Sequence, residues 1–483
     1  MEHQTDINMY KGLASYFLPD GVLDYFDVVD FAEEPTPEDR LYRSILHLYL
    51  DERDNRPSSM SLAKPNGFTE ECRILDFPIR DRETILHVRR RRWTTPEGHN
   101  YIVPLESIAH EKTQYSKELA LFLRRRMDNE PITAKSLSHT YMIDGGTFEK
   151  NYKDVLSGFR SWSQRDHASD WVLLPENMGG HLGLNETSFC HEVYTILHNK
   201  DGHGGKHTVI AIIKGTKPPE VIEKLMLLPE EMRLKVADIT MDLSNSMGSI
   251  AKSAFPKAVI IRDCFHVIQR CGEGIEEIRL RLKREAIKEQ KKEKAEFRKK
   301  LERLSKQRKA YRKTHKRPKG KKRGRKPMRL SARFVPSTLS NEETKVESLT
   351  RCRKQMLKSR DKWTDGQEER AKLLFGEYPK LKEAYGIINS LRDIFKGKSL
   401  TKDSARTRLH EWYDKVTEST LRETKAVRDT IKTYEDEILN YFISRATNAS
   451  AESLNSKLKA FRSQLRGVRD IPFFFYRVSL VFG

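Results

Sequence analysis

The chain has 483 residues, a length that allows two to four domains, and 33% of its residues are charged. Its formal net charge of +21 favours a polyanionic partner, above all nucleic acid. No apolar stretch approaches the roughly 20 residues that a membrane-spanning helix needs. The five cysteines form no C-x-x-C pair, which argues against zinc-ribbon and disulfide scaffolds. We therefore expect a reduced, cytoplasmic protein without a secretion signal or membrane partner.

Residues 1–110 mix short apolar runs with turns, and we expect an N-terminal α+β DNA-binding domain here. The stretch ETILHVRRRRW (83–93) is rich in β-formers and arginine, and TTPEGHNYIVP (94–104) supplies a turn and a second apolar run. Together they predict a basic β-hairpin.

Residues 111–170 have the pattern of a helical segment. The stretch YSKELALFLRRRM (115–127) has helical periodicity, and residues 131–156 predict two short helices on either side of the turn MIDGG. This arrangement resembles a helix-turn-helix, whose second helix would present Lys150, Asn151 and Lys153 to a DNA major groove. A plain helical hairpin is the alternative. In either case the side chains expected to pack between the two helices are Leu137, Tyr141, Ile143, Phe148 and Tyr152.

Residues 171–275 predict an α/β arrangement. Three β-rich runs come first and are followed by a helix and then by two strands with a helix between them, the second helix capped by Ser244 or Asn245. This is the order of an RNase H-like core, a mixed five-stranded sheet with helices. Acids at the ends of its first and fourth strands meet at one point, and a later helix supplies a third; Asn185, Asp242 and Glu452 stand at those places. The predicted strands are 180–185, 193–200, 207–215, 236–242 and 257–267, and the predicted helices are 218–228 and 244–255.

A large helical insertion is expected at 276–440, because the separation of Asp242 from Glu452 is far too long for a loop. Residues 364–395 have apolar side chains at helical spacing, and Trp363 and Trp412 are expected to anchor this domain. Residues 441–483 would then complete the core and carry Glu452 on a helix.

The positive charge is concentrated between Arg279 and Arg329, where 26 residues are Lys or Arg and five are Glu. The first part predicts a long exposed helix. The segment 316–329 contains Gly and Pro and cannot stay helical, and its Arg323-Gly324-Arg325-Lys326 resembles an AT-hook, in which Arg side chains enter a narrow A·T minor groove. The alternative is a flexible basic linker that holds phosphate without sequence preference.

Three blocks of sequence carry a resemblance to a known family. They are 241–267 (MDLSNSMGSIAKSAFPKAVIIRDCFHV), 361–385 and 448–483. In this order they are similar to DDE transposases of the ISL3 type, and most similar to the ISAon1-like branch of bacterial insertion sequences. The resemblance covers roughly residues 113–483. Residues of about 12–100 also look like the small N-region partner of that branch, fused here into one chain.

The resemblance implies an RNase H-like fold and two divalent metal ions, Mg²⁺ with Mn²⁺ as an alternative. It also implies DNA cleavage and strand transfer at the terminal inverted repeats of an element. Asp242 and Glu452 match two of the three metal-binding acids, and Asn185 stands where the family pattern has the first Asp. The run DCFH (263–266) matches a D-x-x-H signature that adds Asp263 and His266 beside the site. Many relatives carry an N-terminal zinc ribbon, for which this chain has no cysteines.

Asn185 admits three interpretations. It is an inactivating substitution that leaves DNA binding intact, or Glu186 moves in to replace the missing acid, or Asn185 is an ordinary turn residue. The first is favoured because Mg²⁺ binds hard anionic oxygens, whereas an amide offers one neutral carbonyl oxygen. Against the second, Glu186 should point to the other face of its strand. Three purely structural alternatives also stay open. Asp242 would be a helix cap, Glu452 a surface acid and His266 a packed core histidine.

The sequence therefore predicts a transposase of the bacterial cytoplasm and nucleoid, acting on terminal inverted repeats and target DNA as a homodimer. One alternative is a catalytically dead DNA-binding protein, such as a repressor or a domesticated relative. The other is an RNase H-like nuclease or resolvase without joining activity.

Overall fold

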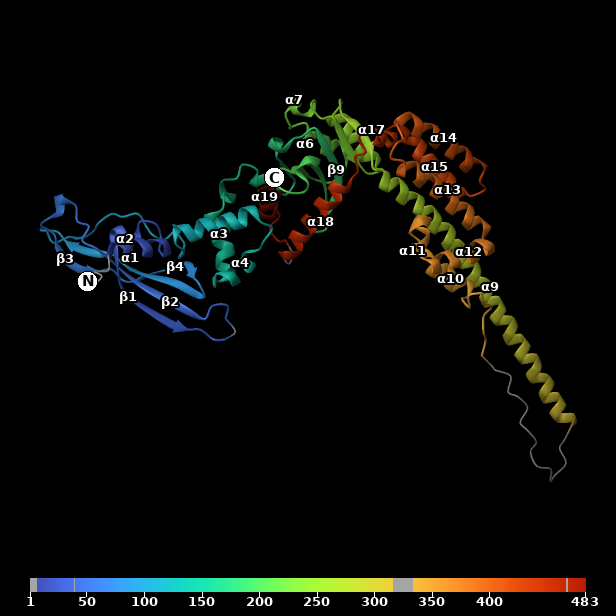
Figure 1. The fold of residues 1–483 in the computed structure, drawn as a ribbon, viewed down its shortest axis with the longest axis horizontal. Coiled ribbons are helices and arrows are strands. Elements are labelled where there is room, and N and C mark those ends of the chain that lie inside the picture. The colour runs from blue at the N-terminus through green and yellow to red at the C-terminus, as the bar shows by residue number, and fades with distance from the viewer. Residues whose placement is uncertain (1–6, 39, 316–332, 466–467) are drawn as a thin grey trace, which may run out of the picture. The chain divides into compact units, whose positions relative to one another are not determined.

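The computed structural model describes residues 7–38, 40–315, 333–465 and 468–483. The chain forms two compact units (Figure 1). Unit 1 consists of Met1–Arg233 and Ser450–Gly483, and unit 2 of Leu234–Ala449. The predicted AT-hook-like segment 316–329, with Arg323, Arg325 and Lys326, lies outside the described residues.

Two sheets form the N-terminal part of unit 1. In the first, with the order β1-β2-β5-β4, β2 and β5 run parallel and the other neighbours antiparallel. The second has the order β3-β6-β7, and its β6–β7 pair forms only the end of the predicted hairpin, with Arg92 opposite Ile102. Most of the predicted first strand (83–93) is instead β5 and belongs to the first sheet. The elements are α1 (Ile7–Ala14), α2 (Val22–Tyr25), β1 (Phe26–Pro35), β2 (Ser44–Glu52), β3 (Lys64–Phe68), β4 (Cys72–Ile79), β5 (Arg82–Arg89), β6 (Arg91–Thr94) and β7 (Asn100–Ile102).

Three helices follow: α3 (Lys117–Asn129), α4 (Ala134–Thr140) and α5 (Gly145–Asn151). The hydroxyl of Ser116 caps α3 by accepting a hydrogen bond from the Leu119 amide, and the carboxylate of Asp144 caps α5 through Thr147. The packing predicted around the MIDGG turn is present, because Leu137, Phe148 and Tyr152 are buried in one cluster. Tyr141 and Ile143 pack against that cluster from its edge.

A third sheet region in unit 1 has the order β9-β10-β11-β8, with antiparallel neighbours. The three predicted strands are β9 (His181–Phe189), β10 (Glu192–Asn199) and β11 (Val209–Lys214). A short strand, β8 (Trp171–Leu173), adds to the predicted set, since three residues are too few to show a strand period. Helices α6 (Pro218–Leu225) and α7 (Glu230–Arg233) follow β11.

The C-terminal helices α18 (Ala449–Gln464) and α19 (Ile471–Phe482) pack on this sheet. Leu454, Leu458 and Phe461 lie at spacings of three and four residues and form the buried stripe of α18. They share an apolar cluster with Ile196 and Ile212 of the sheet. The sheet therefore fixes which face of α18 stays outside.

Unit 2 begins with a parallel strand pair, β12 (Asp238–Met241) and β13 (Val259–Arg262), joined through α8 (Asn245–Ala254). The prediction of a strand through Val267 is wrong, because β13 ends at Arg262 and the long helix α9 (Cys264–Thr314) begins two residues later. Buried Cys264, Val267 and Cys271 recur every three or four residues, which is a helical rather than a strand spacing. The helix α9 continues without a break across residues 275 and 276, where the boundary between the core and the helical insertion was predicted.

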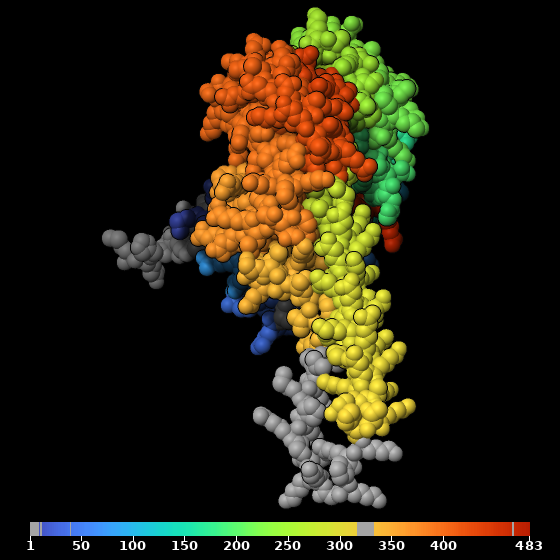
Figure 2. All heavy atoms as spheres, turned by 90° about the vertical axis from the view of Figure 1, so that its right-hand side faces the viewer, coloured from blue at the N-terminus to red at the C-terminus, as the bar shows by residue number. Residues whose placement is uncertain are grey.

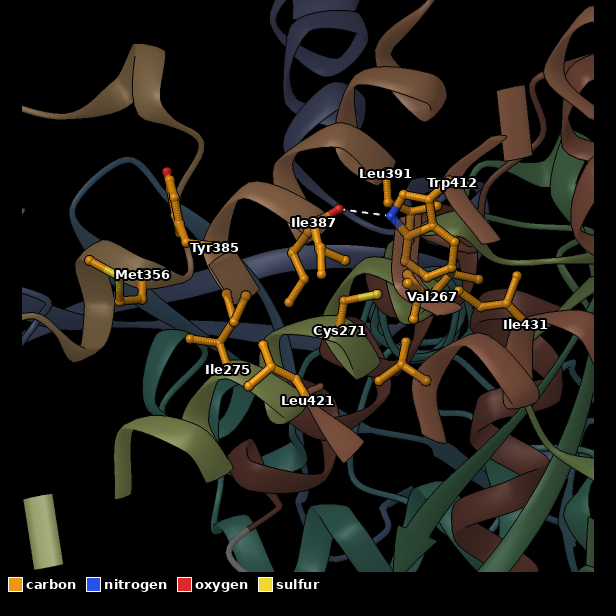
Figure 3. Packing of buried hydrophobic residues seen from close by; sticks show 14 of the residues in the cluster. Val267, Cys271, Ile275, Met356, Tyr385, Ile387, Leu391, Trp412, Leu421 and Ile431 are labelled. Atoms are coloured by element: carbon orange, nitrogen blue, oxygen red, sulfur yellow. Dashed lines mark hydrogen bonds between the residues drawn. The ribbon is translucent and has the colours of Figure 1, made fainter. Parts of the chain in front are cut away.

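The remaining helices pack around the first half of α9. Figure 3 shows Val267, Cys271 and Ile275 of α9 facing Ile387 and Leu391 in the core of this unit. The indole Nε1 of Trp412 donates a hydrogen bond of 2.8 Å to the backbone carbonyl of Ile387 (Figure 3). These helices are α10 (Lys345–Arg351), α11 (Arg353–Met356), α12 (Asp365–Glu377), α13 (Pro379–Lys396), α14 (Lys402–Glu418), α15 (Arg422–Thr433), α16 (Glu435–Leu439) and α17 (Tyr441–Ser444).

The second half of α9 extends beyond the helices packed on its first half (Figure 2). Every Lys and Arg between residues 284 and 313 is exposed, as expected for the basic helix. Within the described residues, no helix is both long enough and apolar enough to cross a membrane.

Candidate active site

Asn185 lies in the middle of β9, opposite Ile196 of β10. The prediction that the strand ends at Asn185 is wrong, because pairing with β10 continues to Phe189. The Asn185 side chain is on the buried face and is 3% exposed, whereas Glu186 is exposed on the opposite face. The turn-residue interpretation therefore does not hold, and the strand alternation directs Glu186 away from Asn185.

The amide of Asn185 makes one side-chain hydrogen bond. Its Nδ2 donates to Oδ1 of Asn455 on α18 at 2.9 Å. Its own Oδ1 is buried and finds no hydrogen-bond partner among the residues that the structure describes. Glu452 stands three residues before Asn455, so the two belong to the same side of α18, and Glu452 is exposed. Position 185 is therefore next to the helix that carries the predicted third acid.

His198 of β10 makes a second bond from the sheet to α18, and no local sequence pattern indicates it. Its Nε2 is 3.1 Å from the hydroxyl oxygen of Ser450. The imidazole fills the space above Gly183, where a Cβ would lie 2.1 Å from Cε1 of His198. Burial lowers the pKa of His198 to about 4, so the ring is neutral near pH 7.

Ser450 and Asn455 flank Glu452 along α18, and both are bonded to the sheet. Farther along, Nζ of Lys457 donates 2.8 Å to the backbone carbonyl of Gly204, in the turn between β10 and β11. Three polar contacts thus join α18 to the sheet and to the turn after β10, and Glu452 is exposed between the first two of them in the sequence.

Unit 2 carries a compact cluster of Asp242, Asp263, His266 and Asn448. Nδ1 of His266 is 2.9 Å from Oδ2 of Asp263 and 3.2 Å from Oδ1 of Asp242. Asn448 donates from Nδ2 to Oδ1 of Asp242 at 2.7 Å and from its backbone amide to Oδ1 of Asp263 at 3.2 Å. The structure therefore brings the predicted residues Asp242, Asp263 and His266 together, and it adds Asn448.

Local secondary structure explains how this cluster forms. Asp242 directly follows β12, and Asp263 is the N-cap residue of α9, which places His266 in the first turn of that helix. The interpretation of Asp242 as a helix cap does not hold, because Ser244 occupies the N-cap of α8, although its hydroxyl makes no capping bond. His266 contacts two carboxylates rather than an apolar core.

The environment of Asp242 has opposing electrostatic effects. Its side chain is 41% exposed, and partial burial raises the pKa of its carboxyl, while His266 and the hydrogen bond from Asn448 act to lower it. Asp263, by contrast, is 1% exposed and is held by two hydrogen bonds.

Arg262, at the end of β13, fixes the backbone beside this cluster and was not among the predicted site residues. The side chain is 1% exposed, and its Nη1 donates to the carbonyl oxygens of Asp242 and Ser244 at 2.8 and 2.6 Å. Its Nε donates to Glu437 at 2.7 Å, which balances the buried charge. The available signal in the sequence was an arginine directly after the apolar run 259–261.

The three residues predicted to face a DNA groove differ in how far their side chains are exposed to solvent. Lys150 is exposed and Asn151 is half-buried. The expectation that Lys153 points outward is wrong, because its ammonium forms an ion pair with Asp470 and lies 5.5 and 5.6 Å from the ring centres of Phe159 and Phe473. Residues Tyr152–Leu156 form a π-helix after α5, and this extra turn places Lys153 against the start of α19.

A comparison with protein families matches residues 182–331 and 320–478 to the ISL3 family of DDE proteins, described as transposases. These ranges include both sheet regions of the candidate site and most of unit 2. The chain belongs to the ISL3 family of transposases. The resemblance seen in the sequence is thus confirmed at the family level. No curated protein matches the chain.

DDE transposases generally use divalent metal ions. In the described part of this transposase, no three His, Cys, Asp or Glu side chains are placed to hold a metal ion together. Position 185 supplies a neutral carbonyl oxygen, and the imidazole of His266 lies between the carboxylates of Asp242 and Asp263. The residues present therefore do not fit a two-metal centre as they stand.

Proposed function

We propose that this chain is a DNA transposase with an RNase H-like core whose catalytic centre is impaired at position 185. Asn185, Asp242 and Glu452 occupy the three acid positions of the family pattern. The observation that carries the proposal is the buried amide of Asn185. Its NH₂ group donates to Asn455, and its carbonyl oxygen has no partner within residues 7–38, 40–315, 333–465 and 468–483. An aspartate of the same shape would supply a negative charge at this place.

Within this proposal, the other residues position the acids. Asn448 and His266 hold the carboxylate of Asp242, and Asp263 orients His266 through the 2.9 Å contact. His198 and Ser450 fix the first turn of α18, which supports Glu452. Buried, hydrogen-bonded side chains such as Asp263 and His198 are suited to a positioning role, because they keep their neighbours in one place. A catalytic site loses activity when its residues are displaced.

DNA would be held by positive charge outside the catalytic positions. The exposed Lys and Arg of α9 offer a continuous polycation, and Lys150 on α5 is a candidate contact of the helix-turn-helix-like segment. The segment with Arg323 and Arg325 adds an AT-hook-like contact. Replacing both arginines by alanine should weaken binding more on A·T-rich flanks than on G·C-rich flanks. Equal loss on both would support the plain polycation instead.

The second candidate function is a DNA-binding protein without catalysis, such as a repressor, and the neutral amide of Asn185 favours it. A third is a nuclease or resolvase that cuts without joining. An assay with labelled inverted-repeat ends of the encoding element separates the three. Binding of both ends with cleavage and joining supports transposition by this chain. Binding alone supports the repressor, and nicking without strand transfer supports the nuclease.

Joining chemistry requires both ends of an element to be brought together, so we propose that two chains assemble on two ends. The helical region of unit 2 is the candidate interface. The expected state is a monomer or weak dimer alone and a complex of two chains with two ends when repeat DNA is added, measured as mass in solution. One chain per end at every protein concentration would contradict it.

A further inference from the structure

The helices α12 and α13 of unit 2 border a pocket that the catalytic proposal does not use. Its volume is about 550 Å³, within the range of roughly 300–1,000 Å³ typical of small-molecule sites. Three aromatic side chains line it, Trp363, Phe375 and Tyr385, and three basic side chains stand with them, Arg360, Lys372 and Lys382.

The three aromatic rings form one cluster. The ring centres of Trp363 and Tyr385 are 4.9 Å apart, and those of Phe375 and Tyr385 are 5.6 Å apart. The polar atoms of these rings are already bonded, since Nε1 of Trp363 donates to the carbonyl of Gln355 at 3.0 Å and Oη of Tyr385 to that of Lys358 at 2.8 Å. The aromatic surface open to the pocket is therefore mainly that of the half-buried Trp363 and Phe375, with Tyr385 packed behind them. Tyr385 itself belongs to the packed core and is 4% exposed (Figure 3).

Two glycines inside the helices also line the pocket, Gly376 near the end of α12 and Gly386 in the middle of α13. Glycine weakens a helix relative to alanine. A Cβ added at either position would meet no atom within 4 Å, so no close packing within the protein requires glycine there. The missing side chains instead leave room in front of the aromatic cluster.

The charge of the pocket limits what fits it. Arg360 is paired with Glu368, which also lines the pocket, at 2.7 Å, whereas Lys372 and Lys382 are exposed. Three cations and one carboxylate disfavour a cationic ligand and attract phosphate. Aromatic surface beside cationic side chains is the combination that binds unstacked bases of single-stranded nucleic acid.

We propose that this pocket holds a nucleobase that has left its stack, with the flanking phosphates on Lys372 and Lys382. The inference rests on the proposed function in that it needs a protein that acts on DNA. It adds a binding site for an unpaired nucleotide. The residues of this site, between 360 and 389, are distant in the sequence from the candidate acid positions 185, 242 and 452.

The test compares two ligands of equal backbone charge, a fluorescent dT8 and the same eight-unit backbone without bases, by anisotropy with the full chain. Stacking of one base should make dT8 bind about tenfold more tightly. Gly386→Leu fills the pocket and should bring the ratio of the two dissociation constants close to one. The matched control is Gly366→Ala, at another open glycine of α12 that does not line the pocket, and it should keep the full ratio.

An unchanged ratio in a Gly386→Leu chain that melts like the parent would overturn the inference. A ratio near one in the parent chain, with both ligands bound, would overturn it and leave DNA binding intact. Failure to bind either ligand would count against the proposed function itself. Photo-crosslinking of a 5-iodouracil oligonucleotide to the unaltered chain gives a second measurement, with adducts expected on Trp363, Phe375 or Tyr385. Adducts found elsewhere alone would contradict the assignment.

Discussion

Asn185 of β9 donates its side-chain NH₂ to Asn455 of α18 across 2.9 Å, and its own buried carbonyl oxygen has no hydrogen-bond partner in the described part of the chain. This contact joins the first predicted acid position to the helix of the third. It also shows how an amide is accommodated there, because each asparagine offers a donor and an acceptor. A carboxylate at 185 would need Asn455 to turn its NH₂ toward it and would leave one anionic oxygen buried.

Asn185→Asp should therefore fold but lose stability in the absence of divalent ions. A buried, unpaired carboxylate costs several kcal/mol unless a cation or a proton neutralises it. Mg²⁺ that binds only the folded chain should restore the stability, by about 2.7 kcal/mol at a concentration one hundred times the dissociation constant. Thermal melting with and without Mg²⁺ measures this, and Asn185→Ala, which adds no charge, should show no such response. Equal melting of the Asp variant in both buffers would contradict the prediction.

His198 should make the stability of the protein depend on pH. Its pKa is lowered to about 4 in the folded chain from 6.5, so the unfolded chain takes up a proton first as the pH falls. Folding stability should then fall between pH 6.5 and pH 4, by about 3 kcal/mol in total for this group. His198→Gln should flatten that part of the curve, measured by urea unfolding at several pH values.

His139→Gln is the control for this experiment, since His139 is exposed at the end of α4. It should leave the difference between pH 6.5 and pH 4 as in the parent chain. A His198 variant with the same pH dependence as the parent would show that this imidazole is not held neutral by burial.

Asn448→Ala should raise the pKa of Asp242 further, because the variant removes a hydrogen bond that favours the charged carboxylate. Loss of a hydrogen bond to a charged group should also cost roughly 1.5–3 kcal/mol of stability. Titration of ¹³C-labelled aspartate by NMR measures the pKa. Asn440→Ala is the matched control, because Asn440 donates to the carbonyl of Ile260 and not to Asp242. A titration of Asp242 identical in both variants would remove Asn448 from this role.

Some parts of this site could be predicted from sequence. The runs that form β10 and β11 are rich in β-branched residues and bounded by a turn, and Asp242 was expected at the end of β12. The end of β9 was not found, because Asn185 and Glu186 look like a strand break and only pairing with β10 carries the strand onward.

The other site residues that were not predicted are held by contacts between positions far apart in the chain. His198 with Ser450 and Asn448 with Asp242 are pairs more than 200 residues apart, and no local pattern indicates them. The start of α9 was misread for a different reason. Cys264, Phe265 and Val267 continue an apolar run, and only the position of Asp263 as N-cap marks the change from strand to helix.

The basic half of α9 should dominate the salt dependence of DNA binding. Arg298, Lys299 and Lys300 are exposed, and each phosphate contact contributes a slope of roughly −0.9 in a plot of log affinity against log salt. Replacing all three by Gln should make the slope shallower by up to about three such increments. The pair Glu296→Gln and Glu302→Gln, on the same helix, should not make it shallower. An unchanged slope in the triple variant would indicate a solvated helix without DNA contact.

If position 185 is the first acid position of a transposase and its amide impairs catalysis, a carboxylate at this position should restore cleavage. The most direct measurement is Mg²⁺-dependent cleavage of labelled inverted-repeat ends by the chain as it stands, by Asn185→Asp, and by Asn185→Asp combined with Glu452→Gln. We expect all three proteins to bind the ends. Only the Asn185→Asp variant should cleave strongly, and adding Glu452→Gln should abolish that cleavage. An Asp variant that binds the ends but cleaves no better than the present chain would contradict the claim.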